Sequence, residues 1–117
     1  MSNELRGIGS FLELLILTNS SIGNEELLAL VTGLTNCTSL ETLRLSRNNF
    51  SSAEAGLGSL SNWLQRDIVN VKYLGLSCCS INDEGLHALS QGAANHCEEL
   101  DLIGNESITA TGLSYLY

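Results

Sequence analysis

Residues 40–48 read Leu-Glu-Thr-Leu-Arg-Leu-Ser-Arg-Asn, with leucines at positions 40, 43 and 45 and an asparagine three residues after the last leucine. The same spacing of apolar residues starts four times, at residues 12, 40, 71 and 97, so the starts lie 28, 31 and 26 residues apart. A fixed period of this length is typical of a solenoid, in which similar units stack on one another. The asparagine position is filled in turn by Ser20, Asn48, Cys79 and Asn105.

Each unit combines two apolar patterns of different period. In the third unit, Leu74 and Leu76 alternate with residues that face the other way, as in a short strand. Asn82 and the acidic residues after it are typical of a helix start, because Asn caps a helix and acids favour its positive end. Apolar residues at helical spacing follow in every unit: they occupy positions 27, 30 and 34, then 57, 60 and 64, then 86, 89 and 93, then 113 and 116.

The pattern predicts one α/β solenoid domain over residues 1–117, a right-handed superhelix of alternating strands and helices. Parallel strands are expected on its concave face and helices on its convex face. We divide the chain into the end of a preceding repeat or a minimal cap (1–11), three full repeats (12–39, 40–70 and 71–96) and a partial fourth (97–117). We recognise no polar cap at either end, which predicts a segment of a longer array or self-association through uncapped solenoid ends. A self-sufficient monomer is the alternative.

These residues resemble a leucine-rich repeat protein of the ribonuclease-inhibitor-like class, which has a helix in every repeat. The stretch from Leu43 to Phe50 matches the family's LxLxxNxL core, and residues 81–86 resemble its strand-to-helix junction. The placement of Cys37 before the second strand and the 26-residue third repeat resemble the cysteine-containing subclass. That subclass is common in substrate receptors of ubiquitin ligases. The resemblance implies a non-catalytic protein-binding scaffold.

Composition narrows the function classes. Five basic and thirteen acidic residues give a formal net charge of −8, which disfavours binding to nucleic acid or anionic lipid. No apolar run approaches the ~20 residues that a membrane-spanning helix needs. Four cysteines without a CxxC pair fit a reducing compartment, and we expect a cytoplasmic protein.

The sequence offers no recognisable chemistry. We expect no metal and no cofactor, because no set of cysteines and histidines has metal-ligand spacing. Cys37, Cys79 and Cys97 are interpreted as structural, and Cys78 as the thiol that faces solvent. Both histidines are expected to face outward from a helix, with no carboxylate pair converging on either. Gly56 and Gly58 lie inside a helical pattern and form no phosphate loop.

The strand residues that face away from the core form columns across the repeats. These columns are Leu14-Thr42-Tyr73-Glu99, Ile16-Arg44-Gly75-Asp101 and Thr18-Ser46-Ser77-Ile103, followed by Asn19, Arg47, Cys78 and Gly104. Arg and Tyr often anchor protein interfaces, and Gly75 predicts a hollow beside Tyr73. The predicted partner-binding residues are Arg44, Ser46, Tyr73, Ser77, Glu99 and Asp101.

Several of these residues have simpler interpretations. Arg44 can pair with Glu99, Asp101 or Glu41 as an ordinary surface charge, and Tyr73 can lie flat on the sheet as a filler. For Trp63, covering the loop of the longer second repeat is favoured over an interface role.

The leading hypothesis is a non-enzymatic module that binds a protein or peptide on its concave face. A second hypothesis is a regulator of an enzyme, such as a small-GTPase activator or a segment of a ubiquitin-ligase substrate receptor. A third is a purely structural segment of a longer array.

Overall fold

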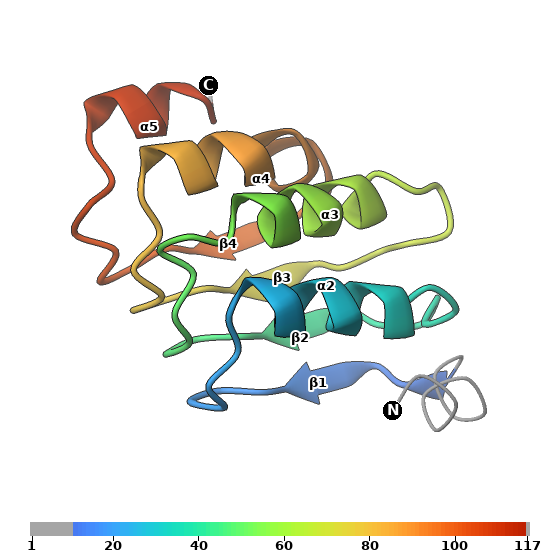
Figure 1. Cartoon of the computed structure of the whole chain (residues 1–117). Helices are drawn as coiled ribbons and strands as arrows, with labels where there is room; N and C mark the ends of the chain where they lie inside the picture. The colour runs from blue at the N-terminus through green and yellow to red at the C-terminus, as the bar shows by residue number, and fades with distance from the viewer. Residues whose placement is uncertain (1–10, 117) are drawn as a thin grey trace.

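The computed structural model describes residues 11–116, within which strands and helices alternate regularly (Figure 1). The elements are β1 (Leu14–Ile16), α2 (Asn24–Gly33), β2 (Thr42–Arg44), α3 (Glu54–Leu64), β3 (Tyr73–Gly75), α4 (Asp83–His96), β4 (Glu99–Asp101) and α5 (Ala110–Ser114). The interpretation of residues 1–10 as part of a preceding repeat or cap falls outside the described residues.

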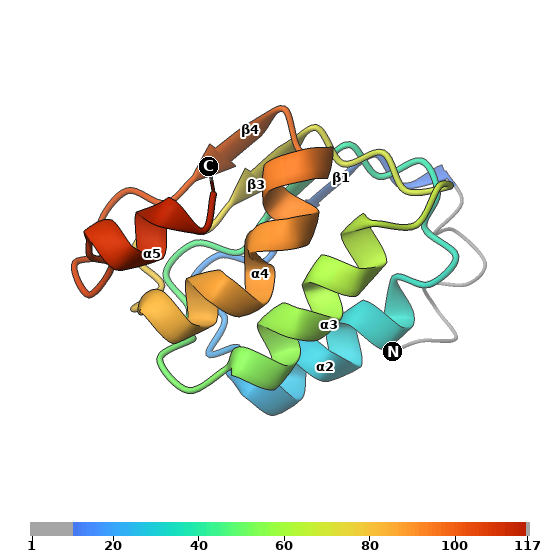
Figure 2. The same cartoon turned by 90° about the horizontal axis from the view of Figure 1, so that it is seen from above.

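The four strands form one parallel sheet in the order β1-β2-β3-β4, so each strand lies beside the strand of the next repeat. The helices stack in a second layer that covers one face of this sheet (Figures 1 and 2). This arrangement confirms the predicted α/β solenoid. The helix-free face of the sheet is the surface on which the sequence placed its candidate residues.

The core lies between the sheet and the helix layer. Leu43 and Leu74, at the centres of β2 and β3, have no exposed surface, and neither have Leu57 and Leu86 on the helices behind them. The corresponding strand leucines of the outer repeats, Leu15 and Leu100, are only partly buried. The two central repeats therefore hold most of the apolar core, because each has a neighbour on both sides within the described chain.

Two buried asparagine side chains connect neighbouring repeats at the turn after the strand. The Asn48 amide oxygen accepts from the backbone N–H groups of Ser20 and Ile22, at 3.0 and 2.9 Å. Its amide nitrogen donates to the carbonyls of Leu17 and Leu45, at 2.9 and 2.8 Å. Each asparagine thus closes the turn of the repeat before its own.

Asn105 makes the corresponding bonds between the third and fourth repeats. Its oxygen accepts from the N–H groups of Cys79 and Ile81, and its nitrogen donates to the carbonyls of Leu76 and Leu102. The four distances lie between 2.8 and 3.0 Å. The two turns are therefore held by the same set of bonds.

The remaining two turn positions behave differently. Cys79 is fully buried, and its thiol donates to the Leu45 carbonyl at 3.2 Å, so this side chain also binds a backbone group. Ser20 is exposed rather than buried. Its hydroxyl donates to the nearby Thr18 carbonyl, while its own N–H is bound by Asn48 of the following repeat.

The residue before each turn position adopts a left-handed backbone conformation in all four repeats. These residues are Asn19, Arg47, Cys78 and Gly104, with φ of 51°, 62°, 54° and 82°. A Cβ on Gly104 would lie 2.6 Å from the Cys78 sulfur, so a larger residue there would require the Cys78 side chain to move. The chain therefore leaves every strand by the same sharp bend.

Neighbouring helices approach closely where α3 meets α4. The Ser61 hydroxyl accepts from the Gly92 N–H at 2.9 Å, and the Ser61 Cα would lie 2.8 Å from any Cβ at position 92. Trp63 is 3% exposed, and its indole N–H donates to the Leu34 carbonyl at 3.1 Å. The tryptophan therefore packs against the end of α2, and an interface role for it is wrong.

This close approach predicts opposite effects for the same substitution at two helical glycines. Gly92→Ala should lower the free energy of unfolding by about 1–3 kcal/mol, because the added methyl group overlaps Ser61. Gly58→Ala should raise it by about 0.5–1 kcal/mol, because no described atom beyond its chain neighbours and the backbone of its own helix lies within 4 Å of the new Cβ, and alanine favours the helix. Urea denaturation of both variants checks this, and destabilisation by both would contradict it.

The turn asparagines should be more important for stability than asparagines elsewhere. Asn48→Ala removes four hydrogen bonds of 3.0 Å or shorter across two repeats, and a longer one to the Ser46 carbonyl, so the free energy of unfolding should fall by about 2–4 kcal/mol. Asn95→Ala is the control, since that exposed side chain only donates to the Gln91 carbonyl of its own helix. Equal urea midpoints for the two variants would rule out the bridging role.

Candidate functional site

The helix-free face carries the predicted columns of side chains. We call it the open sheet face and define it by the strand residues at positions 14, 16, 42, 44, 73, 75, 99 and 101. The strand register pairs Thr42 with Tyr73 and Tyr73 with Glu99. It also pairs Arg44 with Gly75 and Gly75 with Asp101, so the sequence-derived columns of the strands are confirmed.

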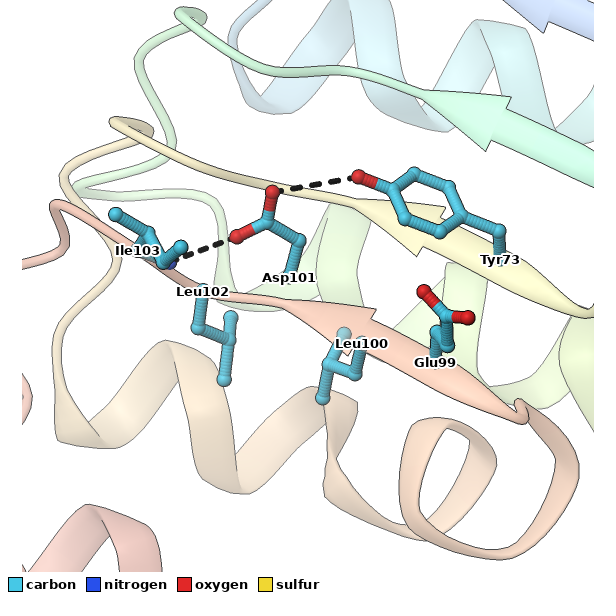
Figure 3. A pocket seen from close by; sticks show the side chains of 6 residues that line it. All are labelled: Tyr73, Glu99, Leu100, Asp101, Leu102 and Ile103. Atoms are coloured by element: carbon cyan, nitrogen blue, oxygen red, sulfur yellow. Dashed lines mark hydrogen bonds between the residues drawn. The ribbon is translucent and has the colours of Figure 1, made fainter.

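Three of the predicted site residues form a connected chain across this face. The Arg44 guanidinium carbon lies 5.2 Å from the centre of the Tyr73 ring, a cation–π contact. The Tyr73 hydroxyl donates to Asp101 Oδ2 at 3.3 Å, and Asp101 Oδ1 accepts from the Ile103 N–H at 3.1 Å (Figure 3). A cation, an aromatic ring and a carboxylate are thus held in a fixed order over β2, β3 and β4.

The electrostatics of this chain keep the tyrosine neutral. Burial raises the pKa of the Tyr73 hydroxyl, and the negative charge of Asp101 and its hydrogen bond raise this pKa further. The Arg44 charge acts in the opposite direction but more weakly. Tyr73 therefore remains a protonated hydrogen-bond donor at neutral pH.

The prediction of a hollow beside Tyr73 is wrong. A Cβ placed on Gly75 would lie 3.0 Å from Cε1 of the Tyr73 ring and 3.4 Å from its hydroxyl, and Gly75 is buried. The tyrosine side chain lies along its own strand and fills the space that glycine leaves, because nothing larger occupies position 75. Tyr73 is therefore a filler of the sheet surface, as one interpretation held, and also a member of the Arg44–Tyr73–Asp101 chain.

The salt bridge on this part of the surface is not the one that the simpler interpretation of Arg44 predicted. Glu41 forms a salt bridge with Lys72, with Nζ and Oε1 3.7 Å apart. Within residues 11–116, Arg44 has no salt bridge to Glu41, Glu99 or Asp101 and instead contacts the Tyr73 ring. Its guanidinium therefore keeps hydrogen-bonding capacity toward solvent.

The two predicted serines lie next to each other and bond to one another. The Ser77 hydroxyl lies 2.9 Å from the Ser46 hydroxyl oxygen, and the Ser77 N–H donates to that same oxygen at 3.1 Å. Both residues are partly exposed. They form a small polar floor one position beyond the strands, next to the left-handed residues Arg47 and Cys78.

A shallow groove runs along β4 at one side of the open sheet face (Figure 3). It has a volume of about 490 Å³ and is lined by Tyr73, Glu99, Leu100, Asp101, Leu102 and Ile103. Tyr73, Glu99 and Asp101 were predicted site residues, whereas Leu100 and Leu102 were assigned to the core. Their incomplete burial is the reason that they also line a surface feature, and the alternation of the strand gives no sign of this.

The cysteines and histidines do not assemble into a reactive site. Cys37 and Cys79 are buried and Cys78 is exposed, as predicted, and Cys97 is partly buried. Both histidines are exposed, and His87 stacks on Tyr115 with 4.2 Å between ring centres. Across residues 11–116, no group of three or more His, Cys, Asp or Glu side chains is placed to hold a metal ion. In the same range, no helix is long and apolar enough to cross a membrane.

The comparison with known protein families matches the repeats at the centre of the chain. The family model described as "Leucine Rich repeat" matches residues 36–53 and 69–90, which contain β2 and β3 with the turns that follow them. No curated protein matches the chain. The matched segments and the solenoid fold together support similarity to leucine-rich repeat proteins. Such repeats generally mediate protein–protein interactions and are typically non-catalytic.

The cysteine environments predict selective thiol chemistry. Burial raises the pKa of Cys97 to about 11 and also raises the pKa of Cys37 and Cys79, so these thiols stay protonated and shielded. Iodoacetamide at about pH 8 should therefore modify Cys78 first, as peptide mapping by mass spectrometry would show. In urea all four cysteines should react. Labelling of Cys97 at the rate of Cys78 in the folded protein would contradict the structure.

Proposed function

We propose that this leucine-rich repeat protein is a non-catalytic module that binds a protein or peptide on its open sheet face. The observation that carries the proposal is the Arg44–Tyr73–Asp101 chain. Arginine and tyrosine are the residue types that most often dominate interface energetics. Here they stand on the two central strands of the described sheet, where the fold is most completely packed.

Pre-organisation supports the proposal. The backbone beneath the three side chains is fixed by the parallel sheet, and each side chain contacts the next one. A partner that docks here orders few groups on this protein, so little conformational entropy is lost on binding. The Ser46 and Ser77 hydroxyls offer hydrogen-bonding groups beside the chain.

The cellular setting that we propose is the cytoplasm. All four cysteines are unpaired thiols, and a reducing compartment keeps them in this form. We also propose that the protein belongs to the ribonuclease-inhibitor-like class and is similar to ubiquitin-ligase receptor segments. Self-association through the solenoid ends is a further part of this proposal.

Charge reversal at the centre of the face tests the proposed function. Peptides are selected from a random display library on immobilised wild-type protein, and their affinities are measured again on Arg44→Glu. Affinity should fall at least about tenfold, because the reversed charge faces the bound peptide. The melting temperature should change little, since an exposed cation–π contact contributes only about 0.5–1 kcal/mol.

The matched control is Arg66→Glu, which makes the same change in net charge. Arg66 lies after α3 and donates to the Thr35 carbonyl, away from the open sheet face. Its charge reversal should leave peptide affinity within about twofold of the wild type. Unchanged affinity in Arg44→Glu, an equal loss in both variants, or the absence of any selected peptide would rule out the proposal. Sedimentation of each protein checks that self-association is unaltered.

A further inference from the structure

The groove along β4 has a composition that defines the chemistry of its occupant. Two carboxylates, Glu99 and Asp101, are separated by one residue on the same face of the strand, so both border the groove. Figure 3 shows their side chains on the side of β4 opposite to the Leu100 and Leu102 side chains. The carboxylates therefore lie on the open sheet face, where Ile103 is the exposed aliphatic residue of the groove lining.

Among the described residues, neither carboxylate has a cationic partner. Within residues 11–116, Glu41 forms a salt bridge with Lys72, and Arg44 makes a cation–π contact with the Tyr73 ring. Asp101 is oriented by two hydrogen bonds, from the Tyr73 hydroxyl and the Ile103 N–H. Because both donors are neutral, they do not compensate its negative charge. Glu99 is exposed. The groove thus holds two negative charges, one of them fixed in position, in a chain of net charge −8.

The groove also has apolar lining. Ile103 is 76% exposed, and among the large hydrophobic residues described only Phe11, at 82%, is more exposed. Leu100 and Leu102 are partly buried, with their side chains on the other side of β4. An occupant must therefore offer aliphatic surface as well as positive charge.

We propose that this groove receives an arginine side chain of the partner, with an apolar residue beside it. The inference rests on the proposed binding function and names the chemistry that the open sheet face recognises. Charge complementarity carries it: a guanidinium satisfies Glu99 and Asp101 together, since it presents several donors in one plane. Its methylene stem covers the exposed Ile103 while the charged head stays in contact with water.

Other occupants fit less well. A divalent cation takes six or more oxygen ligands, whereas the described residues here supply two carboxylates and no third acidic, histidine or cysteine ligand. Anionic groups such as phosphates are repelled by Glu99 and Asp101. A lysine ammonium is a point charge that does not match two separated carboxylates in one plane.

Titration with a defined peptide tests the proposal without knowledge of the natural partner. Acetyl-Leu-Arg-Leu-amide is added to ¹⁵N-labelled wild-type protein up to about 10 mM, a range that detects weak millimolar binding. Saturable shifts are expected at the amides of Asp101, Leu102 and Ile103. The peptides with lysine or glutamine in place of arginine should bind at least about threefold and tenfold more weakly, respectively.

Matched variants connect binding to the two carboxylates. Glu99→Gln combined with Asp101→Asn should weaken binding of the arginine peptide about tenfold, because both charges are lost while the shapes are kept. The control is the double variant Glu84→Gln, Glu106→Gln, which makes the same change in net charge at exposed positions outside the groove. It should leave affinity within about twofold of the wild type.

The outcomes separate this inference from the proposed function. No saturable shift, equal binding of the three peptides, or an equal loss in both double variants overturns the arginine assignment. If library-selected peptides still depend on Arg44 in that case, the open sheet face remains a binding surface for a partner of different chemistry. The opposite result is also distinguishable: Arg44→Glu has no effect on the selected peptides, but the arginine peptide binds the groove as described. The proposed role of Arg44 is then wrong, and the arginine assignment for the groove holds.

Discussion

The arrangement of repeats depends on the buried side chains of Asn48 and Asn105. Each amide satisfies two N–H groups and two carbonyls at a place where the chain turns away from the sheet and has no secondary structure of its own. Because part of each set belongs to the preceding repeat, the amide fixes the relative position of two units as well as the shape of one turn. This constraint supports the parallel register at the β1–β2 and β3–β4 junctions. At the β2–β3 junction the Cys79 thiol donates to the Leu45 carbonyl instead.

A second constraint is the spacing between neighbouring helices. It is set by the small residues Gly92 and Ser61 and by the large residue Trp63. Gly92 lets α4 approach Ser61 of α3, while Trp63 fills the space at the end of α2 and bonds to the Leu34 carbonyl. Asparagines on one side and close helix contacts on the other couple each repeat only to its neighbours. Stability in such a structure is a sum of nearest-neighbour terms, so local damage at one junction is felt chiefly by two repeats.

The sequence was sufficient for the fold and for the identity of the residues on the open sheet face. Strand alternation has a period of two, and repeats stack in register, so positions such as Arg44 and Asp101 could be assigned to one column before any coordinates. Side-chain conformation could not be assigned in this way. Tyr73 turns onto Gly75 and Arg44 follows it, because these choices depend on which neighbouring space is left empty in three dimensions.

The order of residues across the open sheet face has a consequence for any bound chain. Within residues 11–116, the face runs from the half-exposed Leu14 and Ile16 on β1, through Arg44 and Tyr73, to Glu99 and Asp101 on β4. The chemistry of the described face therefore changes from β1 to β4, which gives the surface a direction. A ligand laid across the strands in one sense meets complementary groups at every step, whereas the same ligand reversed meets like charges and mismatched apolar contacts. Such a surface selects the polarity of its partner as well as its composition.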